Sequence, residues 1–496
     1  MRLFALVLSS LAVACAPVGP DFVRPDVPVN PDWLQAELQQ FESSPAELAE
    51  WWRMLEDPVL DELIDTAIRS NNNLRIAGLR VIESQANLGI ATGNQYPQVQ
   101  ALSGDASVSD TGSLTLQQYS LGAGLSWEMD FWGRFRRGIE AADANLLANI
   151  ANYNDVMVLV TATVADAYMI IRATEEQLRL AHDSLKLQQR SYDIVDVLFR
   201  NGSSSELDAL QARTLLLSTR ATIPGLEITL EQSKSALSVL LGIAPAKFEQ
   251  VFKGDGAPPD VPDAVLVGVP ADMLRQRPDV RRAELQALSQ NALVGVAQAN
   301  LYPSFSLNGF LGVSSTDVDT GNALIDDLFS SDSGAVSIGA GFVWPFFNYG
   351  RIRNNVRVQD ARLQQALLAY QETVLQAARE AEDAMSSLAG TRAQDGILSE
   401  SVIVAQRSAN LAFLRYQEGF ADYQRVLDAQ QRLFNQQQRY AANRGEVVRS
   451  LIRLYRSLGG GWQQDKPPAY IDEATREQMR ERTHWGDLLE APPPNP

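Results

Sequence analysis

Residues 146–171 read LLANIANYNDVMVLVTATVADAYMII, and the spacing of their apolar side chains decides the fold. Apolar residues recur in alternating steps of four and three, at Leu146, Ile150, Tyr153, Met157, Val160, Val164, Ala167 and Ile171. A period of 3.5 residues held over this length predicts one long helix with a coiled-coil seam. The same period continues beyond Ile171 with two polar interruptions, Thr174 and Gln188. A helix from Gly133 to Arg200 would be on the order of 100 Å long.

The same pattern occurs a second time, 217 residues further along the chain. Leu363 begins the second seam and corresponds to Leu146. The glycines that follow the two seams, Gly202 and Gly419, have the same separation. A fixed separation held over a whole helix indicates a tandem duplication. We therefore expect two long helices of equal length.

Four segments between the helices have the alternation of β-strands. In residues 119–127 and 336–344, apolar and aromatic side chains alternate with mainly Gly and Ser. Residues 305–313 give a third strand, and residues 99–108 give a weaker fourth. Ten-residue alternation of this kind is typical of transmembrane β-barrels. Aromatic residues expected at the membrane–water interface cluster at one end. They include Trp127, Trp132, Trp344 and Phe346.

Four strands are too few to close a barrel, which needs about eight or more. A sheet edge exposed to lipid is excluded, because its backbone groups would lack hydrogen-bond partners. The strands must therefore combine with strands from other subunits. The predicted fold is mostly α with membrane β, and it requires an oligomer.

Shorter helices complete each repeat. They are predicted at residues 58–95, 206–241, 279–302 and 423–458. Each is about half as long as a long helix or shorter, so two of them stacked end to end could match one long helix. The predicted organisation is a first repeat at 57–242, a linker at 243–271, a second repeat at 272–458 and a C-terminal segment at 459–496.

The N-terminus reads as an export signal. Residues 1–14 have a basic residue, an apolar run and small residues at the end, which predicts a signal peptide. Cys15 is the only cysteine, and its position resembles a bacterial lipobox, although Ala12 replaces the usual Leu. We therefore expect a lipid on Cys15 as the mature N-terminus. Residues 15–56 begin with a proline-rich stretch and are predicted to form an extended strap.

Composition excludes several function classes. The 496 residues carry a formal net charge of −18, which argues against nucleic acid as a partner. Two histidines and one cysteine leave little scope for a metal site or a nucleophilic triad. No phosphate-binding loop is present. We expect a protein that is not an enzyme and has no cofactor and no metal. No apolar run looks long enough for a transmembrane helix.

These features resemble the TolC/OprM family of bacterial outer-membrane efflux proteins, in its lipoprotein branch. The matching motifs are Cys15 with residues 19–25 (GPDFVRP), residues 277–281 (RPDVR), both Tyr-Pro strand starts, and Tyr416-x-x-Gly419 with residues 426–429 (VLDA). The resemblance implies a homotrimer with a twelve-stranded outer-membrane barrel and a periplasmic α-barrel. It also implies a membrane-fusion adaptor and an inner-membrane resistance-nodulation-division pump as partners.

The resemblance also implies a gate at the far end of the long helices. The turns at Gly202 and Gly419 would meet the adaptor. Asp208 and Asp428 match the family's constricting acidic residues, and Tyr416 matches its latch tyrosine. This sequence departs from the family pattern, since Ala421 replaces an expected arginine and Arg425 stands at an often acidic position. We expect Arg425 or Arg415 to hold the latch and the tip to be closed at rest.

The leading hypothesis is a passive exit duct that conducts drugs or other toxic small molecules from a tripartite pump across the periplasm and outer membrane. A duct for type I protein secretion or for heavy metals is the alternative within this class. A stand-alone porin or a structural envelope protein belongs to a different class. The paired long helices argue against a porin, and the strands argue against a pure coiled coil.

Overall fold

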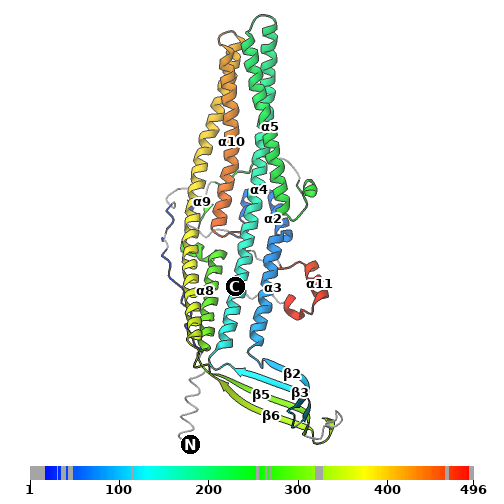
Figure 1. Cartoon of the computed structure of the whole chain (residues 1–496). Helices are drawn as coiled ribbons and strands as arrows, with labels where there is room; N and C mark the ends of the chain where they lie inside the picture. The colour runs from blue at the N-terminus through cyan, green and yellow to red at the C-terminus, as the bar shows by residue number, and fades with distance from the viewer. Residues whose placement is uncertain are drawn as a thin grey trace.

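The computed structural model shows an elongated helical rod with a four-stranded sheet at one end (Figure 1). It describes residues 17–28, 30, 32–34, 41–42, 48–113, 115–252, 256–262, 265–267, 270–318, 328–463 and 469–490. The predicted signal peptide and Cys15 lie outside these residues. We call the end of the rod opposite the sheet the tip, and we call the half of the rod that leads to it the distal half.

The two predicted long helices are confirmed. They are α4 (Arg134–Arg200) and α9 (Arg351–Gln417), and each has 67 residues. Each begins after a glycine in the left-handed conformation, Gly133 at φ 75° and Gly350 at φ 82°. Close packing also requires glycine at position 133, because a Cβ there would lie 2.4 Å from the Pro17 side chain.

Shorter helices flank the long ones in both halves of the rod. They are α2 (Pro58–Ser70), α3 (Asn72–Gly93), α5 (Glu206–Leu240), α8 (Pro278–Ala299) and α10 (Tyr423–Ser457). Near the sheet, α4 packs against α3 and α8, and α8 packs against α9. In the distal half, α4 packs against α5 and α10, and α10 packs against α9. The result is a layer of helices in which α3 and α5 lie on one side and α9 on the other (Figure 1).

The prediction of one continuous helix over 58–95 was wrong. The chain breaks at Asn71, which ends α2 and caps α3, because its side chain accepts hydrogen bonds from the backbone N–H groups of Asn73 and Leu74 at 2.9 and 3.1 Å. Asparagine is a strong N-cap because its short side chain reaches these unpaired donors. The expected start of α2 at Pro58 is confirmed, with Asp57 as its N-cap.

The break at Asn71 forms a splice between the two halves of the rod. Its side-chain amide donates to the Leu240 carbonyl at 2.8 Å, which joins the end of α5 to the start of α3. In the second repeat the Arg277 guanidinium donates to the Ser457 carbonyl at 2.6 Å and joins α10 to α8. The four residues correspond in pairs under the duplication. In each repeat, the residue just before the helix near the sheet therefore donates to a carbonyl at the end of the distal helix, which has no partner within that helix.

Arg277 is the more strongly held of the two splice residues. It is buried, and it also donates to the Asp279 carboxylate at 3.0 and 2.8 Å and to Glu380 at 2.8 Å. Burial alone would raise the pKa of Asp279, but the hydrogen bonds and positive charge of Arg277 outweigh it and lower that pKa. The RPDV element of residues 277–280 thus acts as a structural joint.

The sheet has the strand order β2-β3-β5-β6 and is antiparallel throughout. Its strands are β2 (Val99–Asp110), β3 (Thr115–Met129), β5 (Ser304–Val318) and β6 (Gly334–Val343). Leu121 pairs with Val313, and Leu311 pairs with Val336, so the predicted apolar residues lie on one face of the sheet. On the other face the Ser126 hydroxyl donates to Asn308 at 2.8 Å. Among the described residues, β2 and β6 have no partner on their outer edges.

The N-terminal strap lies along the helices near the sheet. The Val18 N–H donates to the Trp132 carbonyl at 3.0 Å. The buried Arg137 side chain pairs with Asp21 at 2.9 Å, and Arg24 pairs with Glu284. Gly19 passes directly over α8, because a Cβ on Gly19 would lie 2.6 Å from the Gly295 backbone.

Short elements surround the middle of the rod. They are β1 (Phe41–Glu42), η1 (Trp51–Leu55), η2 (Pro245–Lys247), α6 (Phe248–Val251), β4 (Val265–Leu266), α7 (Pro270–Gln276), α11 (Glu473–Arg482) and η4 (Gly486–Leu489). β1 and β4 form a parallel pair. The main hydrophobic core lies at this level, where Trp51 stacks on Tyr455 with ring centroids 5.5 Å apart.

One window of α4 has the length and composition of a membrane span, with a mean hydropathy of 1.7, which corrects the expectation that no such run exists. Of this window, 61% is buried inside the protein. Its apolar character is explained by the helices that surround α4, since a helix that is apolar on most sides is a buried one.

Replacing Arg277 by methionine should lower the free energy of unfolding by roughly 3 kcal/mol, because it removes the partner of the partly buried Asp279 carboxylate and of the Ser457 carbonyl. The control is Arg379→Met, which removes an exposed pair with Asp383 and should cost less than about 1 kcal/mol. Urea unfolding of the detergent-solubilised protein measures both. Equal effects of the two substitutions would contradict the role given to the splice.

The same splice predicts a dependence of stability on pH. Because the pKa of Asp279 is lowered below 3.8 in the folded state, its contribution is present above that pH and is lost as the pH falls through the folded pKa. As the pH falls from 5 through the folded pKa of Asp279, the free energy of unfolding should therefore decrease more in the wild-type protein than in the Arg277→Met variant. Parallel curves of stability against pH would contradict this.

Candidate functional site at the helical tip

The tip consists of two similar turns, one in each repeat (Figure 1). Gly202 and Gly419 have φ values of 74° and 78°, in the left-handed region that glycine adopts without strain. Their N–H groups donate to the carbonyls of Phe199 and Tyr416 at 2.9 and 3.0 Å. A Cβ on either glycine would have no neighbour within 4 Å. Both turns therefore present open backbone at the end of the rod.

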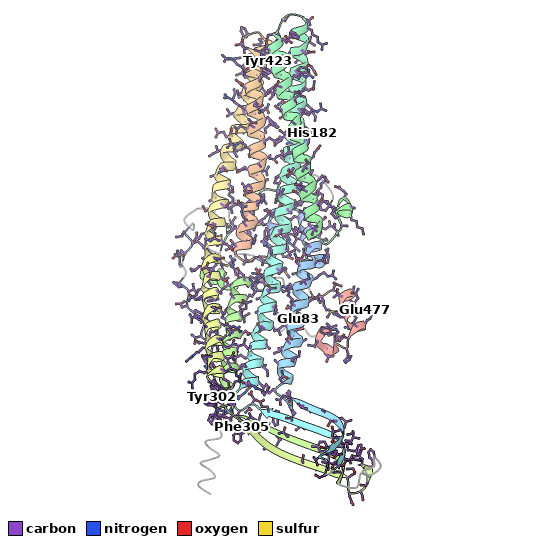
Figure 2. All side chains as sticks on the ribbon, in the orientation of Figure 1. Glu83, His182, Tyr302, Phe305, Tyr423 and Glu477 are labelled. Atoms are coloured by element: carbon purple, nitrogen blue, oxygen red, sulfur yellow. The ribbon has the colours of Figure 1, made fainter. Side chains whose placement is uncertain are left out.

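A compact aromatic and aliphatic cluster lies directly behind the turns. Tyr423, at the start of α10 and labelled in Figure 2, is buried against Val195 of α4 and Leu215 of α5. Its ring lies 5.0 Å from that of Tyr416. Burial raises the pKa of Tyr423, and the neighbouring Tyr416 and Asp208 raise it further. The cluster joins the two helical hairpins at the tip.

The structure brings two of the four predicted gate residues to this cluster. Asp208 and Tyr416 both lie next to Tyr423. The hydroxyl of Tyr416 makes no hydrogen bond within the described chain, so a latch through this hydroxyl needs a partner from another copy.

Asp208 also has a structural task at the start of α5. It forms a capping box with Ser205, in which the Asp208 N–H donates to the Ser205 hydroxyl at 3.1 Å and the Asp208 carboxylate accepts from the Ser205 N–H at 3.3 Å. The Ser204 hydroxyl donates to the same carboxylate at 3.1 Å. A capping box satisfies two donors that the first turn of a helix leaves free.

The other two predicted gate residues lie on the exposed side of α10. Asp428 accepts a hydrogen bond from the Gln424 side chain at 3.0 Å. Arg425 is exposed and forms no ion pair with any residue that the structure describes. The expected latch is therefore not formed within one chain by Arg425, and Arg415 is exposed as well.

Sequence reasoning missed Tyr423 as the centre of the cluster. Its signal was the spacing of Tyr423, Val426, Leu427 and Gln430, which places them on one face of α10. All four are buried.

The predicted membrane-interface aromatics lie where the sheet meets the helices, near Tyr302 and Phe305 in Figure 2. The indole N–H of Trp127 donates to the Gln95 carbonyl at 3.2 Å, and that of Trp344 donates to the Leu301 carbonyl at 3.0 Å. These bonds correspond under the duplication.

Two further aromatics belong to the same junction. Trp132 donates to the Pro303 carbonyl at 2.8 Å and stacks on Tyr302, with ring centroids 4.5 Å apart. Phe346 is exposed. Its exposed ring and the anchored indoles fit an interface with lipid headgroups.

Within the described part of the chain, no group of three or more His, Cys, Asp and Glu residues could hold a metal ion. Near its two turns the tip has the carboxylates of Asp208 and Asp428, the phenols of Tyr416 and Tyr423, and open backbone at Gly202 and Gly419.

Comparison with known proteins finds similarity over most of the chain. The sequence profile described as "Outer membrane efflux protein" matches residues 63–243 and 269–460. The probable outer membrane lipoprotein SilC of Salmonella typhimurium is 31% identical over 93% of this chain and 99% of its own length. The cation efflux system protein CusC of Escherichia coli is 32% identical over 92% and 98%. The solved structure of the outer-membrane channel OprN superposes with a TM-score of 0.84 at 30% identity, over 90% of this chain and 100% of that one.

Replacing Asp208 by alanine should destabilise the first turn of α5 by about 1 kcal/mol, because the capping box is lost. Asp428→Ala should leave local stability unchanged, since Asp428 is exposed and bonded only to Gln424. Amide hydrogen exchange of residues 206–212 and 424–430 measures the two effects. Equal protection of residues 206–212 in Asp208→Ala and wild type would show that the cap contributes nothing.

Proposed function

Because the chain belongs to the outer membrane efflux protein family and is an outer-membrane efflux channel, we propose that three copies form a passive exit duct for a tripartite pump. The observation that carries this proposal is the four-stranded sheet, which is unpaired at both edges within the described residues, has an apolar face and is attached to 67-residue helices. A single copy of such a sheet cannot lie in lipid, because its edges would leave backbone groups unpaired.

Three copies supply twelve strands, which is enough for a closed barrel. In such a barrel, β2 of one copy pairs with β6 of the next. The apolar residues share one face of the sheet and would face lipid, including the exposed Leu311 and Ile338. The polar face, with Ser126 and Asn308, would line a wet lumen.

The helices support the same order of copies around the ring as the pairing of β2 with β6. Large apolar side chains are exposed in the distal half on α5, among them Leu210, Leu217 and Ile228, and on α9, among them Ile397, Val404 and Leu411. These two helices lie on opposite sides of the single chain's helical layer, so α9 of one copy can cover α5 of the next. A head-to-tail interface of this kind closes into a ring when the rotation per copy is right.

The proposed partners follow from the two ends of the duct. The sheet meets outer-membrane lipid. The tip, with the open backbone at Gly202 and Gly419, would meet a periplasmic membrane-fusion adaptor that connects to an inner-membrane resistance-nodulation-division pump. The proposed substrates are small toxic molecules, since a passive wall conducts what the pump delivers.

Leucine at Gly202 or Gly419 should reduce efflux and adaptor cross-linking while the oligomer still assembles. A Cβ at either position has no described neighbour of its own chain within 4 Å, so the main obstacle to the leucine is a partner, besides about 1–2 kcal/mol of left-handed strain. The control is Gly112→Leu, in the turn between β2 and β3 at the sheet end of the molecule. Gly112 is also left-handed, and an added Cβ there also has no described neighbour within 4 Å. Unchanged efflux and cross-linking at the tip would place the adaptor elsewhere.

The gate is tested by the conductance of the purified oligomer in a planar bilayer. Three Asp428 carboxylates around an axis should favour cations, so Asp428→Ala should reduce cation selectivity. Asp208→Ala combined with Tyr416→Phe should raise the resting conductance, because it weakens the contacts behind the tip turns. Wild-type conductance and selectivity in all these variants would move the gate away from the tip.

The proposed lipid anchor on Cys15 has its own test. Cys15→Ser should abolish acyl labelling of the mature protein, and membrane association should survive because the sheet also anchors the chain. An unmodified mature N-terminus in mass spectrometry of the wild type would overturn the assignment.

A further inference from the structure

A polar layer interrupts the apolar core of the distal half. Four nearly fully buried side chains form it: Gln188 and Ser191 of α4, Thr219 of α5 and Gln430 of α10, each at most 4% exposed. Gln188 is also one of the two polar interruptions of the α4 seam. Such a layer is costly unless every polar atom in it has a partner.

The neighbouring clusters place these residues at one level. On the tip side, Val195, Leu215 and Val426 pack together from α4, α5 and α10. On the other side, Ala181, Ile223 and Phe434 pack together from the same three helices. The four polar residues lie between these clusters on each helix. The Gln430 side-chain N–H donates to the Ser191 hydroxyl at 2.8 Å, which links α10 to α4 within the layer.

Three oxygens of the layer lack a partner among the described residues: Gln188 Oε1, Thr219 Oγ1 and Gln430 Oε1. Thr219 differs in this from Thr214, Thr222 and Thr229 of the same helix, whose hydroxyls each donate to a backbone carbonyl of α5. All three atoms are shielded from solvent, so a neighbouring copy of the chain cannot reach them.

We propose that these three oxygens form a binding site for one buried water molecule. The two glutamine carbonyls accept hydrogen bonds and the threonine hydroxyl can donate one. A water molecule supplies two donors and accepts through its lone pairs, so it matches this set. Buried waters typically make about three hydrogen bonds to such groups. A hard cation fits less well, because the site has no carboxylate.

The bound water gives α10 an adaptable contact in the distal half. Nearer the sheet, α10 is fixed to α4 by the ion pair of Arg449 with Asp166 at 2.7 and 3.3 Å, and by the close approach of Gly445 to Ala173. If the proposed gate opens by a shift of α10, the water at the layer can exchange hydrogen-bond partners. Each buried oxygen then keeps a partner. This consequence rests on the proposed gate, but the water site does not.

The test is Thr219→Val, which replaces the hydroxyl by a methyl group of the same size. If a water bridges the layer, the variant removes one of its partners and costs about 1 kcal/mol, which corresponds to about fivefold faster amide exchange at residues 216–222 and 428–433. If the layer is dry, the variant removes an unsatisfied hydroxyl, and exchange should slow or stay unchanged, which would overturn the proposal.

Thr214→Val is the matched control, since Thr214 is exposed and bonded to its own helix, and it should leave exchange unchanged. A high-resolution structure with thallium in place of sodium separates water from a cation. Density without anomalous signal between Gln188, Thr219 and Gln430 supports the water site. An anomalous peak there would replace the water by a monovalent cation. These readouts do not depend on transport, so their failure is distinguishable from failure of the duct.

Discussion

The two edges of the four-stranded sheet, which have no partner in the described part of the chain, are the constraint on which the rest of the structure depends. Backbone N–H and C=O groups on β2 and β6 cannot remain unpaired in lipid, where each would cost several kcal/mol. In the proposed ring, closure by further copies would satisfy them and fix a rotation axis. The same axis would let α5 of one copy and α9 of the next cover each other's exposed apolar side chains. The aromatic junction, where Trp127 and Trp344 bond to the ends of α3 and α8, connects the sheet to the helices.

Duplication explains why the helical part has the same length in both repeats of the chain. In each repeat one long helix lies beside two shorter helices joined at a splice, and Asn71 and Arg277 satisfy the carbonyls at those joints. The residues differ while the hydrogen-bonded position is the same. A buried arginine needs carboxylates, and Asp279 and Glu380 supply them in the second repeat alone. The two repeats thus use different side chains, an amide and a guanidinium, to donate to the corresponding carbonyl at the end of the distal helix.

Much of this architecture could be predicted from the sequence, because the signals were long. The 3.5-residue period predicted α4 and α9, and alternation predicted the strands with one face apolar. The break at Asn71 was missed because the apolar pattern continues across it, although three successive asparagines at 71–73 signalled a cap. At the tip, the resemblance named Asp208 and Tyr416 as gate residues, and the structure places both beside Tyr423, while their role in a gate stays a prediction. It could not show the capping box of Asp208 or the burial of Tyr423, which depend on how helices pack. A latch by Arg425 or Arg415 stays a prediction.

The central claim is that copies of this chain complete each other's sheet, and disulfide cross-linking tests it most directly. Cysteines are introduced one at each edge, in β2 at Ser103 and in β6 at Gly339, in a Cys15→Ser background, with neighbouring positions on the same strands to cover the register. Oxidation in the outer membrane should give dimers and trimers that disappear on reduction, and no larger species. Cysteines in the inner strands β3 and β5 should give none. Monomers at every edge pair, or cross-links between two β2 edges, would contradict a head-to-tail ring.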